Sequence, residues 1–60
     1  MIIATCDKYE LIKDERGVYF FCRNKLWCSC GYIKDDETAI SEFKTWLQKQ
    51  NCNPDGIMLY

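Results

Sequence analysis

The chain has 60 residues, of which 48% are hydrophobic and 28% charged, with a formal net charge of -1 and no histidine. A chain this short buries only about 60% of the surface that it exposes when unfolded, so we expect one marginally stable domain over residues 1–60. No apolar run approaches the roughly 20 residues that span a bilayer, and the N-terminus lacks the basic start of a signal peptide. We therefore expect a cytoplasmic protein with no membrane partner.

The charges are distributed unevenly along the chain. Residues 1–34 carry a surplus of two positive charges, whereas residues 35–60 carry a deficit of three. A net charge of -1 argues against a dedicated nucleic-acid binder of the usual basic kind.

Four short apolar segments follow one another from the N-terminus, each bounded by polar turn residues. The expected strands are residues 2–6, 9–13, 18–22 and 26–32. Asp14 and Gly17 occupy the first and last positions of a predicted β-turn, where these residue types are favoured. Consecutive strands with short connections form an antiparallel meander, so we expect a four-stranded antiparallel sheet.

The register of the last predicted hairpin decides which face of the sheet each side chain occupies. A three-residue loop over residues 23–25 places Phe20 opposite Cys28, whereas a two-residue loop separates Cys22 from Cys28 and Cys30. Neither loop has ideal turn residues, because lysine is unfavourable where φ must be positive. We favour the three-residue loop, since it gives the helix one face of mainly small apolar side chains: Val18, Phe20, Cys22, Leu26, Cys28 and Cys30. The opposite face then carries Tyr19, Phe21, Trp27 and Ser29.

Residues 36–50 show the clearest helical pattern in the chain. Asp35 or Asp36 can cap the helix, and Glu37 adds negative charge where the helix dipole favours it. Asn51 can end the helix in the left-handed conformation, and Pro54 forbids its continuation. The apolar residues lie within an arc of about 120° on a wheel of 100° per residue: Ala39, Ile40, Phe43, Trp46 and Leu47.

These elements predict an α+β fold. It consists of a four-stranded antiparallel meander with one α-helix, about residues 36–50, packed on one face. Residues 57–60 are apolar and could add a short C-terminal fifth strand, antiparallel beside the first.

The five cysteines follow the spacing C-x15-C-x5-C-x-C-x21-C. Structural zinc takes four nitrogen or sulfur ligands, commonly as close pairs such as C-x2-C, and that pair is absent. Free cysteine is common as a small core residue, so we expect reduced core thiols with no metal and no cofactor. A cysteine-held zinc module and a redox role stay as alternatives.

The sequence contains no convincing catalytic group. Without histidine, acid–base chemistry would fall to carboxylates, lysine, tyrosine or cysteine. The carboxylates at residues 35–37 are explained by the start of the helix, and so small a chain lacks a deep pocket. We expect a protein that is not an enzyme.

The predicted outer face of the sheet carries the functional hypothesis. Tyr19, Phe21 and Trp27 are expected there, flanked by Arg23 and Lys25. An exposed aromatic patch usually marks a contact surface, and tyrosine, tryptophan and arginine dominate interface energetics. We therefore expect a non-enzymatic protein that binds a protein partner through its sheet face or edge. Phages and mobile elements encode small inhibitors of host factors of this type. The alternatives for this face are a second small core and a homodimer seam.

The main alternative function is nucleic-acid binding through the same five residues. Three stretches carry the resemblance that suggests it: Gly17-Val18, Asn24-Lys25-Leu26-Trp27 and Asp36-Glu37-Thr38-Ala39. Over residues 16–47 the chain resembles the AP2-type and integrase N-terminal domains, an analogy of fold. The resemblance implies a small antiparallel sheet that reads DNA, backed by one helix. The chain departs from those families in its low density of basic residues.

Overall fold

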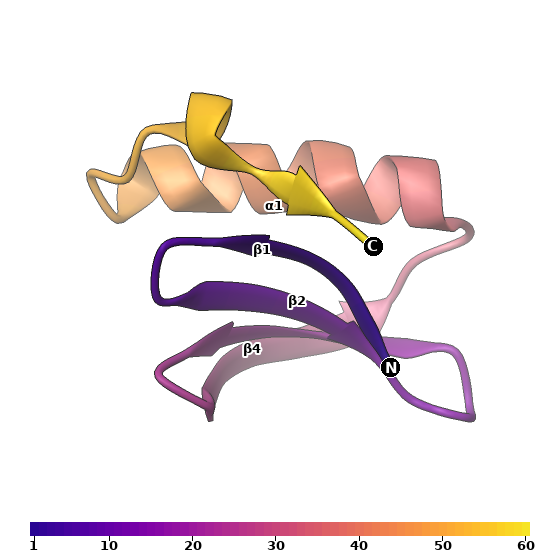
Figure 1. Cartoon of the computed structure of the whole chain (residues 1–60). Helices are drawn as coiled ribbons and strands as arrows, with labels where there is room; N and C mark the ends of the chain where they lie inside the picture. The colour runs from indigo at the N-terminus through magenta and orange to yellow at the C-terminus, as the bar shows by residue number, and fades with distance from the viewer.

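The computed structural model describes the backbone of residues 1–60 and all side chains except those of Trp27 and Cys28. The strands are β1 (Ile2–Cys6), β2 (Tyr9–Lys13), β3 (Val18–Arg23), β4 (Leu26–Tyr32) and β5 (Met58–Leu59). They form one antiparallel sheet in the order β4-β3-β2-β1-β5. Helix α1 (Asp36–Lys49) lies across one face of this sheet, followed by the short 3-10 helix η1 (Pro54–Gly56) (Figure 1). The predicted α+β fold, with its fifth strand beside the first, is confirmed.

Local sequence explains where α1 begins and ends. The side chain of Asp35 accepts a hydrogen bond from the backbone N–H of Thr38 at 2.7 Å, which satisfies one of the unpaired donors of the first turn. At the other end Asn51 adopts a left-handed φ of 59°, and the N–H of Cys52 donates to the carbonyl of Leu47. This arrangement closes the helix close to its predicted end.

The core lies between α1 and the face of the sheet that it covers. Leu11, Phe43 and Leu47 are fully buried there, and Tyr19 is only 1% exposed. The rest of the buried cluster comes from the first two strands and the helix: Ile3, Ala4, Cys6, Tyr9 and Ala39. In the described backbone, no helix or strand covers the other face of the sheet, which we call the open face (Figure 1).

The β3–β4 hairpin corrects the predicted register. Its turn has two residues, Asn24 and Lys25, both at positive φ (52° and 67°), so that Arg23 pairs with Leu26. A register shift follows, after which Phe20 pairs with Cys30 instead of Cys28. The three-residue loop is therefore wrong. The positive φ of Lys25, which argued against the shorter loop, is accepted because a two-residue turn with both residues at positive φ matches the twist of the flanking strands.

The two faces of β3 are also reversed relative to the prediction. Tyr19 and Phe21 point toward α1, where the ring of Phe21 lies 5.8 Å from that of Phe43 and 5.4 Å from that of Trp46. The prediction that these two rings face away from the helix is wrong. The physical reason is strand pairing: Phe21 pairs with Leu11, which is fully buried under α1, so Phe21 and its same-face neighbour Tyr19 lie on that face too.

Candidate binding surface on the open face

An apolar row of side chains crosses four strands on the open face. The strand register pairs Ile2 with Ile12, Ile12 with Phe20, and Phe20 with Cys30. Residues that pair directly across antiparallel strands lie on the same face, so these four side chains are neighbours. Ile2 is 37% exposed and Cys30 is exposed, while Ile12 and Phe20 are half-buried. We call this set the apolar row.

The residues that border the apolar row are uncharged, with the exception of Glu10. On one side, Val18 pairs with Tyr32, which is 81% exposed. On the other side, Glu10 pairs with the buried Cys22 and with Thr5. Among the described side chains of the apolar row and of these bordering pairs, Glu10 is the one charged residue, and none is basic. The apolar row is thus uncharged, and at its border Glu10 lines a hollow together with Lys8 and Lys25.

Strand β4 forms an edge of the sheet beside the apolar row. In the described pairing its one neighbour is β3, so the outer side of its backbone is open to another chain. Its sequence, LWCSCGY, contains none of the charged or proline residues that commonly protect an edge strand. Leu26 and Tyr32, at its two ends, are among the most exposed apolar side chains of the molecule.

A small cleft lies between β4 and α1, where the helix does not cover the edge of the sheet. Its volume is about 180 Å³, and its lining includes Ser29, Gly31 and Ile33 from the sheet side and Glu42 from the helix. A side chain at Gly31 would meet no atom within 4 Å, so the space above this residue is open. Pockets for drug-sized ligands are larger, about 300–1,000 Å³, and this cleft suits a single side chain.

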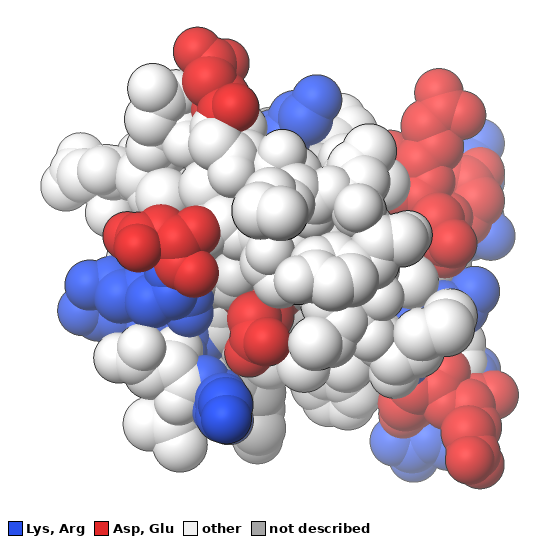
Figure 2. All heavy atoms as spheres, viewed as in Figure 1, with Lys and Arg blue, Asp and Glu red and all other residues white. Residues whose placement is uncertain are grey.

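Strand β5 forms the opposite edge of the sheet and is also apolar. Met58, Leu59 and Tyr60 are all exposed, and β5 pairs with β1 over two residues. In Figure 2 uncharged atoms fill much of the middle of the view, over β5, and charged side chains surround them, with one acidic group just below the centre. The exposed side chains of β5 are therefore apolar, with Glu37, Lys44 and Asp55 lining the hollows beside Leu59.

The five residues predicted as one binding site do not share one face. Tyr19 and Phe21 belong to the core under α1, and Arg23 pairs with Tyr9 on that same side of the sheet. Lys25 is exposed in the turn, and the side chain of Trp27 lies outside the described residues. Sequence reasoning missed Ile2, Ile12 and Phe20 as surface residues. The signal that could have found them is the alternation of β1 and β2, which puts Ala4 and Leu11 in the core.

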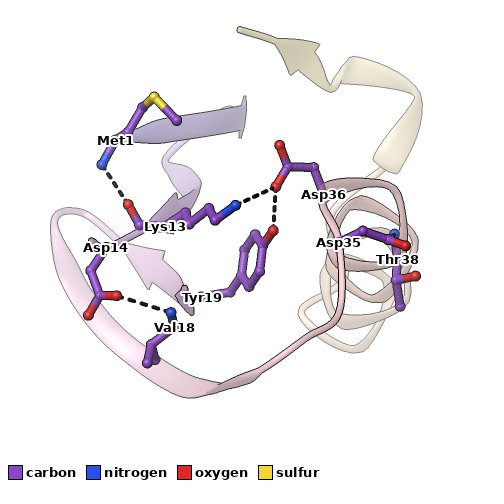
Figure 3. Close-up of polar contacts among 8 residues, drawn as sticks. All are labelled: Met1, Lys13, Asp14, Val18, Tyr19, Asp35, Asp36 and Thr38. Carbon is purple, nitrogen blue, oxygen red and sulfur yellow. Dashed lines mark hydrogen bonds and ion pairs between the residues drawn. The ribbon is translucent and has the colours of Figure 1, made fainter. Parts of the chain in front are cut away.

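A polar network joins the helix side of the sheet to the start of α1. The hydroxyl of Tyr19 donates to Oδ1 of Asp36, and Nζ of Lys13 lies 3.4 Å from the same oxygen (Figure 3). The hydrogen bond from Tyr19 lowers the pKa of Asp36, with Lys13 contributing further. The bond to Asp36 and burial raise the pKa of Tyr19. This network fastens α1 to β2 and β3, which is a structural role.

The cysteines do not form a metal centre in the described part of the chain. Cys6, Cys30 and Cys52 are outside any disulfide. No group of three or more histidine, cysteine or acidic side chains among the described residues is placed to hold a metal ion. Cys28 lies outside that description.

Comparisons with known proteins give no assignment. No helix in the described residues combines the length and apolar character needed to cross a membrane. No protein-family model matches the chain, and no curated protein or solved structure matches it.

Proposed function

We propose that this chain is a non-enzymatic binding protein that takes a protein partner on its open face. The observation that carries the proposal is the apolar row, Ile2-Ile12-Phe20-Cys30, on a face that no other described element covers. Contiguous exposed apolar surface on a small protein usually marks a contact site. The uncharged edge of β4 adds backbone groups that could pair with a strand of the partner.

The chemistry of the open face defines the partner. An apolar centre with Glu10 at its border fits a protein patch that is apolar in the middle and carries a lysine or arginine beside it. The nucleic-acid alternative has less support, because the chain has a net charge of -1 and none of the four residues of the apolar row is a basic group for phosphates. The rings of Tyr19 and Phe21, which that alternative needs for stacking, pack against the helix.

The proposal is tested by placing a charge in the apolar row. We expect Phe20→Lys to reduce binding of the partner at least 100-fold, because a buried lysine without a counter-charge costs several kcal/mol at an interface. Glu10→Lys should reduce binding less, by loss of the border ion pair and like-charge repulsion. Thr45→Lys, on the exposed side of α1, is the matched control and should bind as the unchanged chain does.

The experiment combines capture of partners from a lysate with the oligomeric state of the purified chain. A protein recovered by the unchanged chain and by Thr45→Lys, but not by Phe20→Lys, supports the proposal. Circular dichroism must show that Phe20→Lys is still folded. Recovery of the same proteins by all variants would contradict the proposal. A purified dimer that Phe20→Lys dissociates would show that the open face is a homodimer seam instead.

A further inference from the structure

Two thiols from opposite ends of the sequence lie in contact beside the core. Cys6 is the last residue of β1, and Cys52 follows the end of α1. Their Sγ atoms are 3.6 Å apart, and the Sγ of Cys6 lies 3.4 Å from the carbonyl oxygen of Asn53. The segment after the helix therefore folds back over the end of β1 and brings the second thiol to the first.

We propose that Cys6 and Cys52 form a reversible disulfide with low-molecular-weight disulfides, such as oxidised glutathione, as the oxidant. A disulfide bond is about 2.05 Å long, so the two sulfur atoms must approach by about 1.5 Å. Cys52 lies in the coil segment between α1 and η1. A Cβ built at Gly56 would be 3.7 Å from the Sγ of Cys6, an ordinary van der Waals contact, so Gly56 lies beside this thiol without a clash.

The exposure of the two thiols gives the order of the chemical steps. Cys52 is half-buried, whereas Cys6 is 3% exposed and burial raises its pKa. The Cys52 thiolate attacks one sulfur of the oxidised glutathione, which forms a mixed disulfide and releases one glutathione thiolate. Cys6 then loses its proton to solvent and attacks the Sγ of Cys52, which releases the second glutathione. Two protein thiols are oxidised, and one glutathione disulfide is reduced to two thiols.

The Cys6–Cys52 disulfide would fasten the segment after α1 to the end of β1. Residues after Cys52 carry η1 and the two-residue strand β5, whose pairing with β1 includes a hydrogen bond of 2.9 Å from the N–H of Tyr60 to the carbonyl of Ile3. So short an exposed strand opens easily. In the oxidised protein β5 would stay in place and cover the edge of β1. In the reduced protein that edge could open.

The test is equilibration with oxidised glutathione, followed by alkylation and a peptide map. Cleavage after lysine and arginine separates the cysteines into peptides 1–8, 17–23, 26–34 and 50–60. We expect peptides 1–8 and 50–60 to be joined, and the Tm to rise by about 15 °C, since the bond closes a long loop in a small domain. Hydrogen exchange at the Tyr60 amide should slow at least tenfold.

Two variants control the experiment. Cys52→Ser should abolish both the joined peptides and the rise in Tm, and Cys30→Ser, on the open face, should leave both unchanged. Three results would overturn the proposal: five alkylated thiols after equilibration, a mixed glutathione disulfide on Cys52 that persists, or a bond that joins peptides 17–23 and 26–34 instead. Addition of a thiol reductant must restore the original Tm.

Discussion

The two faces of the sheet use similar residues for different purposes. Strand β3 contributes Tyr19 and Phe21 to the face under α1, and Val18, Phe20 and Cys22 to the open face. Under the helix the aromatic rings contact one another, with Tyr9 edge-on to Trp46 at 5.3 Å and Phe43 stacked on Trp46 at 6.0 Å. On the open face, Phe20 has Ile12 and Cys30 as its cross-strand neighbours.

The difference in burial assigns the face under α1 to folding and the open face to binding. One helix can cover one face of a sheet, and the covered face contains the residues that are buried most completely. A domain of 60 residues has little stability to spare, so apolar side chains left on the open face contribute less to folding than they could. We infer that their apolar character serves a contact, and the predictions below test this separation.

The largest expected effect comes from the centre of the covered face. Phe43 is fully buried and contacts both Phe21 and Trp46. We expect Phe43→Ala to lower the free energy of unfolding by about 3–5 kcal/mol, through lost burial and the cavity left behind. This is a large part of the stability of so small a domain, so the variant should be mostly unfolded. Urea unfolding followed by circular dichroism measures it, and a loss below about 1 kcal/mol would contradict the assigned core.

A neighbouring pair of phenylalanines compares the two faces directly. Phe21→Ala should cost about 2–3 kcal/mol, because the ring packs against two aromatic residues of α1. Phe20→Ala should cost about 1 kcal/mol and should weaken partner binding, because its half-buried ring belongs to the apolar row. Urea midpoints and binding affinities of the two variants give the comparison. Equal losses of stability would show that the open face is a second core.

The sequence alone predicts most of the helices and strands and the buried side of α1. It does not predict which side chains of β3 face the helix. The i, i+4, i+8 spacing of Ala39, Phe43 and Leu47 identifies the buried side of α1 without knowledge of the strands. The faces of β3 depend on pairing, and a shift of one residue exchanges its inner and outer side chains. Val18 to Cys22 is apolar at every position, so its own pattern does not distinguish the faces. The deciding residues are Ala4 and Leu11 on the neighbouring strands.

The hairpin turn offers a smaller test, because it sets the register that assigns the faces of β4. Lys25 has a φ of 67°, which costs a residue with a side chain about 1 kcal/mol and costs glycine almost nothing. We expect Lys25→Gly to raise the free energy of unfolding by about 0.5–1 kcal/mol. Asn24→Gly, the control, should give less, because asparagine tolerates the left-handed region. A loss of stability in Lys25→Gly would indicate that the loop has another conformation.

The smallest expected effect comes from the hydrogen bond that joins Tyr19 of β3 to Asp36 of α1. Tyr19→Phe keeps the buried ring and removes the hydroxyl that donates to Asp36, whose side chain is about half exposed to water (Figure 3). The pKa of Asp36 is lowered in the folded chain, so the stabilisation from this bond is present above about pH 4 and is lost as the pH falls through the lower, folded pKa.

At alkaline pH the same bond acts through Tyr19. Its pKa is raised in the folded chain, so the contribution is complete below about pH 10 and is lost as the pH rises through the folded pKa. Urea midpoints of the unchanged chain and Tyr19→Phe should therefore differ between about pH 5 and 9 and converge toward both extremes. Tyr32→Phe, at an exposed position of β4, should match the unchanged chain throughout. A difference for Tyr19→Phe that stays constant from acid to alkali would mean that the hydroxyl acts on packing alone. In that case the hydrogen bond from Tyr19 to Asp36 would not contribute to the attachment of α1 to the sheet.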